Sequence, residues 1–190
     1  MVFKYYLFYY NKVTKIEIFI LGCLLVELMK CVIDTSPVIW LRKIGMEDLP
    51  FQIYETCYTT QSVNKELRRF QVSDAYIDKL VVPESVRREA KRFDKLTRRW
   101  KRRFESEDTA DVEVFVTYKF YSDAEEMLFA NKDAQEKIRR RKGIVRDLSH
   151  IFELAEEREI FSREQSKHYL QKLLSVEFRI PYVQTLLARL

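Results

Sequence analysis

The stretch VIDTSPVIWLRKIG, residues 32–45, places an acid directly after a short apolar run. The apolar residues predict a buried strand, and the residues after Asp34 predict a helix. Ser36 or Thr35 can cap that helix, and Gly45 ends it. An unpaired carboxylate is costly inside a core, so we expect Asp34 at the solvated end of the strand.

The next two segments predict that this strand belongs to a parallel sheet. Residues 53–60 are β-branched and aromatic, which is typical of a strand, and residues 62–70 predict a helix capped by Ser62. Strands that alternate with helices form parallel sheets, and such sheets bind ligands beyond the carboxyl ends of their strands. Asp34 can therefore hold a metal ion at this edge, or it can simply cap the following helix.

The remaining chain predicts several helices and one further strand. In order, these are a charged helix over 82–108, a strand over 110–120, and helices over 122–143, 144–162, 163–178 and 182–190. The strand is inferred from alternation and β-branched residues, and Ser122 is expected to cap the helix that follows it.

Composition excludes several classes of protein. The 190 residues carry a net charge of +5, with basic residues concentrated in 87–104 and 137–146. Such clusters suit a polyanion, or they are solvated helix faces. The three cysteines form no CxxC pair and there are two histidines, so no zinc pattern is present. There is also no glycine-rich phosphate loop and no GxSxG motif.

Residues 1–28 differ from the rest of the chain and predict an apolar and aromatic N-terminal extension. Between Glu17 and Glu27 only nine residues are apolar, whereas a membrane span needs about 20, so no transmembrane segment is expected. The compact domain is expected to start near Met29. One hypothesis for the chain is therefore an interaction protein that uses this extension to bind a partner.

Three segments resemble PIN-domain nucleases, in particular a prokaryotic branch that opens with this strand and helix. They are VIDTSPVIWLRKIGMEDL (32–49), YETCYTTQSVNKEL (54–67) and the tail over 140–187. The resemblance implies an α/β fold over 29–190: a three-layer α/β/α PIN-like sandwich with a central parallel sheet and a helical C-terminal tail over 144–190.

The resemblance also implies an activity. PIN domains gather four acids at the strand ends, where Mg²⁺ or Mn²⁺ activates water for attack on a phosphodiester. Position by position, Asp34 takes the first acid and Glu66 the second. Glu66 can instead pair with Arg68 or Arg69 on the surface of its helix.

The last two acids allow three alignments. The first uses 123–130 as the acid-bearing helix and offers Asp123 or Glu126. The second uses 127–138 as the last strand and its helix, with Asn131 and Asp133 near the last acid. The third uses 114–123 as that strand, puts Asp123 just past it, and takes the third acid from Glu89 or Asp94.

The alternation over 112–118 favours the third alignment. The predicted catalytic residues are Asp34, Glu66 and Asp123, and the same three with Asp133 are the predicted metal ligands for Mg²⁺ or Mn²⁺.

Hydroxyl and basic side chains are candidates for nucleic-acid binding. Thr35 and Ser36 can bind a metal-bound water or a phosphate. The basic candidates are Arg87, Lys91, Arg98, Arg102 and Arg103. Their neighbours Trp100 and Phe93 either stack on bases or pack inward.

The resemblance thus favours a cytoplasmic, metal-dependent endoribonuclease that cleaves single-stranded or structured RNA. It further implies the toxin of a toxin–antitoxin pair, with an antitoxin protein or a second copy of the chain as partner. The alternative is a catalytically degenerate PIN-like module that binds RNA or a partner protein.

Overall fold

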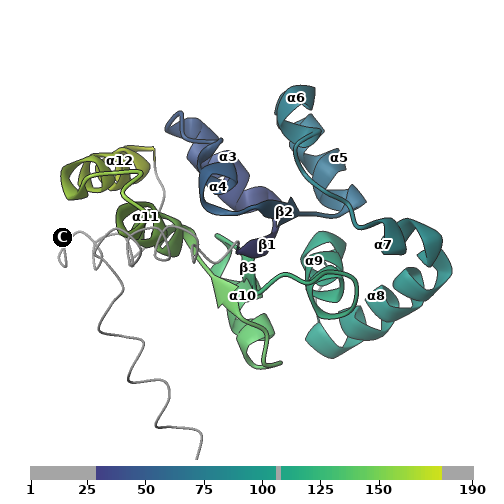
Figure 1. Ribbon diagram of the computed structural model, residues 1–190. Helices are drawn as coiled ribbons and strands as arrows, with labels where there is room; N and C mark the ends of the chain where they lie inside the picture. The colour runs from purple at the N-terminus through teal and green to yellow at the C-terminus, as the bar shows by residue number, and fades with distance from the viewer. Residues whose placement is uncertain (1–28, 106–107, 177–190) are drawn as a thin grey trace, which may run out of the picture.

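A four-stranded parallel sheet forms the centre of the computed structural model, which describes residues 29–105 and 108–176 (Figure 1). Its strands are β1 (Lys30–Ile33), β2 (Thr56–Tyr58), β3 (Glu126–Leu128) and β4 (Val145–Arg146). The order across the sheet is β2-β1-β3-β4, and each neighbouring pair is parallel. The prediction of an α/β fold with a central parallel sheet and a helical C-terminal region is confirmed.

Helices fill every connection between the strands. Those between β1 and β2 are α3 (Thr35–Lys43) and α4 (Leu49–Ile53). Those between β2 and β3 are α5 (Gln61–Arg69), α6 (Asp74–Ile77), α7 (Glu84–Arg88), α8 (Ala90–Phe104) and α9 (Thr109–Phe120). Then α10 (Lys132–Arg139) joins β3 to β4, and α11 (Leu148–Glu157) and α12 (Arg163–Ser175) follow β4.

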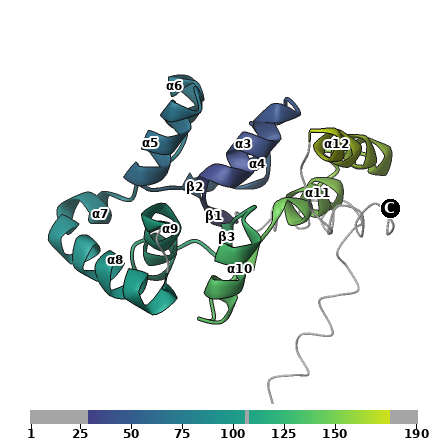
Figure 2. The same cartoon turned by 180° about the vertical axis from the view of Figure 1, so that it is seen from behind.

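The helices cover both faces of the sheet. On one face α9 contacts β1 and β3, α10 contacts β4, and α8 packs on α9 from outside. On the other face α4 contacts β2 and α11. Both views show α3, α4 and α11 on the side opposite α9 and α10 (Figures 1 and 2).

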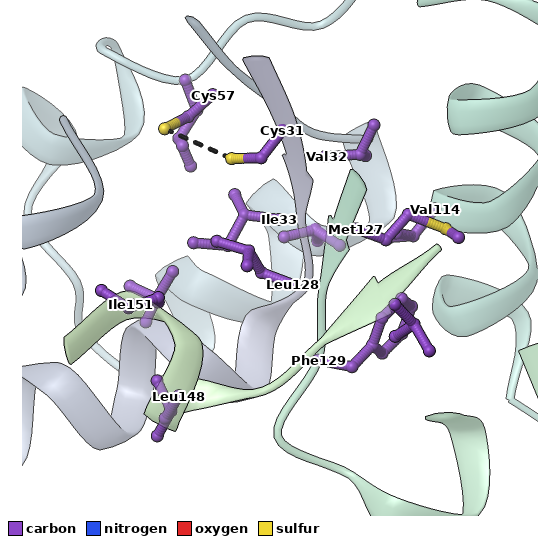
Figure 3. Close-up of a cluster of buried hydrophobic side chains, with 14 of the residues drawn as sticks. Cys31, Val32, Ile33, Cys57, Val114, Met127, Leu128, Phe129, Leu148 and Ile151 are labelled. Atoms are coloured by element: carbon purple, nitrogen blue, oxygen red, sulfur yellow. Dashed lines mark hydrogen bonds between the residues drawn. The ribbon is translucent and has the colours of Figure 1, made fainter. Parts of the chain in front are cut away.

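Burial on both faces explains why the strands are short continuous apolar runs. In Figure 3, Val114 of α9 lies on one side of the strands, and Leu148 and Ile151 of α11 lie on the other. Cys31 of β1 and Cys57 of β2 are directly paired, are buried, and place their Sγ atoms 3.7 Å apart.

The predicted strand over 110–120 is wrong, because this segment is helix α9. Asp108 caps the helix by accepting hydrogen bonds from the backbone N–H groups of Ala110 (2.8 Å) and Asp111 (3.4 Å). The helix lies between α8 and the sheet, so residues on most of its sides are buried. A helix buried all round loses the 3.6-residue periodicity that identifies a surface helix, and its β-branched residues then resemble a strand.

Several other predicted boundaries are corrected. The segment 122–143 is a turn, strand β3 and helix α10, and Asn131 rather than Ser122 caps that helix. The segment 82–108 is two helices, α7 and α8, which meet at Glu89. The predicted helix over 144–162 begins with strand β4.

Two predictions fall wholly on residues outside those that the structure describes: the N-terminal extension over 1–28 and the last helix over 182–190. Within the described residues, no helix has the length and apolar character needed to cross a membrane.

Candidate active site

The carboxyl ends of β1 and β3 meet at the point where the chain changes direction across the sheet. From β1 the chain moves outward to β2 through helices on one face, and from β3 it moves outward to β4 through α10 on the opposite face. Ligands of open parallel sheets bind at such a point. Two contacts join the strand ends: Asp34 N–H donates to Leu128 O (3.1 Å), and Ala130 N–H donates to Ser36 Oγ (3.1 Å).

Asp34 follows the last residue of β1 and is 4% exposed. Its Oδ2 accepts hydrogen bonds from Ser36 Oγ (2.7 Å) and Ser36 N–H (3.2 Å), so Asp34 is the N-cap of α3. Burial raises the pKa of this carboxyl; the bonds from Ser36 oppose the rise, and the charge of Glu66 adds to it. The cap predicted as one reading of Asp34 is therefore present, and so is the position at the strand end, but the expected solvation is wrong because the carboxyl group is buried.

Glu66 reaches the same place from α5. Thr35 Oγ1 donates a hydrogen bond of 2.6 Å to Glu66 Oε2, which ties the helix to the residue after Asp34. Arg68, a predicted alternative partner of Glu66, forms its ion pair with Asp74 instead. The cap of α5 is Thr60 rather than the predicted Ser62.

Asp111, in the first turn of α9, is a third acid at this edge that was not predicted. Burial, followed by the charges of Asp34, Asp108 and Glu66, raises its pKa to about 7, while Lys137 of α10 opposes the rise. The sequence did contain a signal for it: Asp108 followed by an acid three residues later is typical of a helix start, where acids are favoured.

A small cavity separates α9 from α10 beside Asp111. Its volume is about 10 Å³, which is room for a single water molecule. It is lined by Phe104, Asp111, Val112, Ala134, Lys137 and Ile138. Asp111 therefore faces a space in which one water can sit beside its carboxyl group.

The start of α10 lies just beyond the end of β3, as the second alignment expected. Asn131 caps the helix, and its side-chain oxygen accepts from the N–H groups of Asp133 (3.0 Å) and Ala134 (3.5 Å). Asp133 is exposed in the first turn. The predicted metal ligand Asp133 is thus at the correct edge of the sheet.

Asp123 lies at the opposite edge, which corrects its prediction as a partner of Asp34. It accepts hydrogen bonds from Lys30 Nζ (2.6 Å) and Tyr58 OH (2.7 Å). Lys30 begins β1, whereas Asp34 follows its end. The bond from Lys30, followed by that from Tyr58, lowers the pKa of this exposed carboxyl.

The other acids proposed for the third and fourth positions are not at the site either. Glu126 begins β3 and is buried at 2% exposure among other polar side chains. Glu89 pairs with Arg92 on the outside of the molecule. Asp94 lies on α8, where it lines a surface depression beside α5 and α9.

The acids at the carboxyl edge have the ligand type and the charge that a divalent cation needs, but they are too far apart to bind one together. Three acids, Asp34, Glu66 and Asp111, lie at this edge: the charge of Glu66 raises the pKa of Asp34, and the charges of Asp34 and Glu66 raise that of Asp111. Carboxylate oxygens are the ligands that Mg²⁺ and Mn²⁺ take. Within residues 29–105 and 108–176, however, no three acidic, histidine or cysteine side chains stand close enough to hold one ion. A bound cation would require these carboxylates to come closer together.

The basic candidates lie on the outer helices of the α9 face. Arg87 is at the end of α7, and Lys91, Arg98, Arg102 and Arg103 follow along α8, all of them exposed. Arg141, after α10, donates to the backbone oxygen of Arg103 (2.9 Å), so the two basic segments of the sequence lie side by side.

The aromatic residues of α8 pack inward, as one of the two readings predicted. Phe93 and Trp100 are buried, and Trp100 packs edge-on against Phe115 of α9 with ring centroids 4.9 Å apart. The guanidinium of Arg103 lies 4.9 Å from the centre of the Trp100 ring. Arg103 is therefore held on the protein, while Trp100 is part of the core.

No protein-family model, curated protein or solved structure matches this chain.

Proposed function

We propose that this chain is a divalent-cation-dependent endoribonuclease of the PIN type that its sequence resembles, with its site at the carboxyl ends of β1 and β3. The observation that carries the proposal is the placement of three acids at this edge: Asp34 follows β1, Glu66 is bound by the neighbouring Thr35, and Asp111 begins α9. Burial and the charges of Asp34 and Glu66 raise the pKa of Asp111 to about 7. Raised pKa values of clustered acids at a ligand-binding edge are typical of functional sites. By the same resemblance, we infer that it is the toxin of a toxin–antitoxin pair.

Asp34, Glu66 and Asp111 would hold the cation, and two hydroxyl groups orient two of them. Ser36 donates to Asp34 and Thr35 donates to Glu66. A bound Mg²⁺ or Mn²⁺ lowers the pKa of a water molecule and polarises the phosphodiester. Without a cation, the carboxyl group of Asp111 exchanges its proton near neutral pH and can accept one from a neighbouring water.

RNA is the substrate that the surface charge supports. The basic candidates Lys91, Arg98, Arg102 and Arg103 are exposed on α8, and α8 packs against α9, the helix that carries Asp111 (Figure 2). Phosphate contacts by such residues dominate the affinity for a nucleic acid and make it depend on salt.

A second candidate function is RNA binding without cleavage. Two observations favour it: the carboxylates of the described residues are too far apart to share an ion, and the side-chain oxygen of Asn131 is occupied by capping α10. In this case the basic surface binds RNA and the addition of EDTA changes nothing.

An RNA-cleavage assay with Mn²⁺, Mg²⁺ or EDTA tests the proposal. We expect cleavage only with a cation, and a loss on the order of 10²-fold or more in Asp34→Asn and in Asp111→Asn, the scale of one lost electrostatic contact to a transition state. Asp123→Asn is the matched control, because it makes the same change at the opposite edge, and it should retain activity.

Circular dichroism shows whether each variant is folded. Cation-dependent cleavage that persists in folded Asp34→Asn contradicts the proposed site. RNA binding by the wild-type chain, with no cleavage under any cation and no effect of EDTA, establishes the second candidate function instead.

A further inference from the structure

A surface depression of about 530 Å³ is formed in part by α5 and α9, the helices that carry Glu66 and Asp111. Its size is within the range of small-ligand sites, about 300–1,000 Å³. Four helices line it, with Gln61, Ser62 and Lys65 from α5, Val86 and Arg87 from α7, Ala90, Phe93 and Asp94 from α8, and Glu113 from α9.

The depression shares two helices with the acids. Ser62 and Glu66 lie one turn apart on α5, so both project from the same side of that helix. On α9, Glu113 follows Asp111 by two residues. The helices that carry two of the three acids therefore also form two walls of the depression.

One wall is apolar and the rim is basic. Val86 and Phe93 are buried at its base, and the small side chain of Ala90 leaves the space above them open. Lys65 and Arg87 are exposed at the rim, and the structure gives neither side chain an ion pair or a hydrogen bond with any described residue. A ligand with a flat apolar group could pack on the apolar wall, and its phosphate could pair with the basic side chains at the rim.

The acids of the depression have separate roles. Glu113 accepts hydrogen bonds from Ser62 and Thr60 at the start of α5, so its carboxylate already occupies the place where a helix N-terminus would attract an anion. A phosphate of the ligand would therefore bind to the side chains of Lys65 and Arg87 at the rim and not to the N-terminus of α5. Asp94 is exposed and can accept a hydrogen bond from the amino group of a base.

We propose that this depression binds one nucleotide of single-stranded RNA next to the phosphodiester at the acidic edge. The base lies against Val86, Ala90 and Phe93, and Lys65 and Arg87 bind the phosphate. Single-stranded RNA is specified because a base must leave its helix to enter such a depression. This inference rests on the proposed function for its substrate class.

Binding is measured by fluorescence anisotropy with a labelled single-stranded RNA oligonucleotide, in EDTA so that no cleavage occurs. We expect Lys65→Ala/Arg87→Ala to weaken binding roughly tenfold at about 100 mM salt. The slope of log K against log salt concentration should become less steep by about 0.7, the value for one neutralised phosphate of a single strand. The control is Arg68→Ala/Arg88→Ala, which removes the same charge from the same two helices. Those arginines pair with Asp74 and Glu84 away from the depression, so their loss should change affinity less than threefold.

A second variant tests whether RNA needs the open volume of the depression, and it leaves the charge unchanged. Ala90→Phe fills the depression from an exposed position at the start of α8, and it should weaken binding roughly tenfold with the salt slope unchanged. Ala75→Phe, at an exposed position of α6, is its control.

Equal weakening by both double variants, or wild-type binding by Ala90→Phe, overturns the inference. These outcomes are separate from those of the cleavage assay. If pocket variants lose binding while no cation supports cleavage, the nucleotide site stands and the nuclease does not. If Asp34→Asn loses cleavage while pocket variants bind RNA normally, the nuclease stands and this site does not.

Discussion

At the scale of single residues, Asp111 links the candidate chemistry to the stability of the fold. Its pKa rises from 3.8 to about 7 because it is half-buried near other acids. Between these two pH values, the folded chain keeps a proton that the unfolded chain has released. The proton therefore stabilises the folded state at low pH, and this stabilisation is lost as the pH rises from about 4 to 7.

Asp111→Asn should consequently stabilise the protein at alkaline pH. In EDTA, we expect the free energy of unfolding at pH 8 to rise by about 2 kcal/mol, and the difference from wild type to shrink towards pH 5. Urea denaturation at both pH values measures this difference.

The control for this prediction is Glu136→Gln, which removes an exposed acid from α10. It should leave stability within about 0.5 kcal/mol of wild type. A destabilised Asp111→Asn at pH 8 would mean that the carboxylate is compensated in the folded chain, and the argument from acid clustering would fail.

Two of the three clustered acids could be predicted from sequence, and the third could not, for a physical reason. Asp34 stands at the end of an apolar run, and Glu66 followed from the resemblance of its segment to the PIN family. Asp111 begins a segment whose residues alternate, so a strand prediction assigned it to the wrong kind of element. Asp123 was chosen in its place because it follows that supposed strand, and it lies at the other edge.

At the scale of elements, the misassigned helix α9 shows where sequence patterns lose their information. Val112, Val114, Phe115 and Val116 are all buried, since the sheet covers one side of α9 and α8 covers another. The apolar residues of this segment therefore show that it is buried, but they do not show the 3.6-residue period of a helix. The cap at Asp108 was the remaining evidence for a helix, and it lies outside the alternating part.

A buried polar cluster joins four elements on the opposite face. Glu126 of β3 accepts hydrogen bonds from Tyr54 OH, after α4 (2.6 Å), and from Arg146 Nε of β4 (3.0 Å). His150 Nε2 of α11 lies 3.2 Å from the same carboxylate. Burial would raise the pKa of Glu126, but the neighbouring His150 and the hydrogen bonds from Tyr54 and Arg146 together hold it below its ordinary value.

Tyr54→Phe should therefore destabilise the fold, because it leaves a buried carboxylate with one donor fewer. We expect the free energy of unfolding to fall by about 1–3 kcal/mol. Chemical denaturation at neutral pH measures the loss.

The matched control is Tyr76→Phe. Tyr76 is also buried, but its hydroxyl has no hydrogen-bond partner among the described residues. Removing that hydroxyl should cost nothing or stabilise slightly. Equal losses in both variants would show that the bond to Glu126 contributes no net stability.

At the scale of the whole molecule, the fold separates two kinds of residue. The acids of α5 and α9, the depression and the basic helices all come from the chain between β2 and β4. The polar cluster around Glu126 and the helices α4 and α11 lie on the other face and join the strands to one another. We infer that the face of α4 and α11 holds the sheet together, while the candidate site draws on α3, α5 and α9 from both faces at the carboxyl edge.

The overall fold was the most predictable feature. The alternation of strands with helices was enough to predict a parallel sheet, whereas the order of its strands depends on long-range contacts. The two basic segments, 87–104 and 137–146, are distant in sequence and adjacent in space. Their adjacency follows from the path of the chain through β3 and could not be read from either segment alone.

The paired thiols of β1 and β2 can report how fast the sheet opens, because they react only when they are exposed. Cys31 and Cys57 are buried, and burial raises the pKa of the Cys31 thiol far above its ordinary value, so iodoacetamide reaches neither while the strands are joined. In a Cys23→Ser chain, we expect both thiols to be alkylated together, at a rate set by the separation of β1 from β2, as mass spectrometry would record.

Alkylation of Cys57 well before Cys31 would contradict this and show that the edge strand opens alone. Since Asp34 directly follows β1, the same rate also measures how long the first acid of the site keeps its place. A divalent cation that binds at this site should slow the alkylation of both thiols.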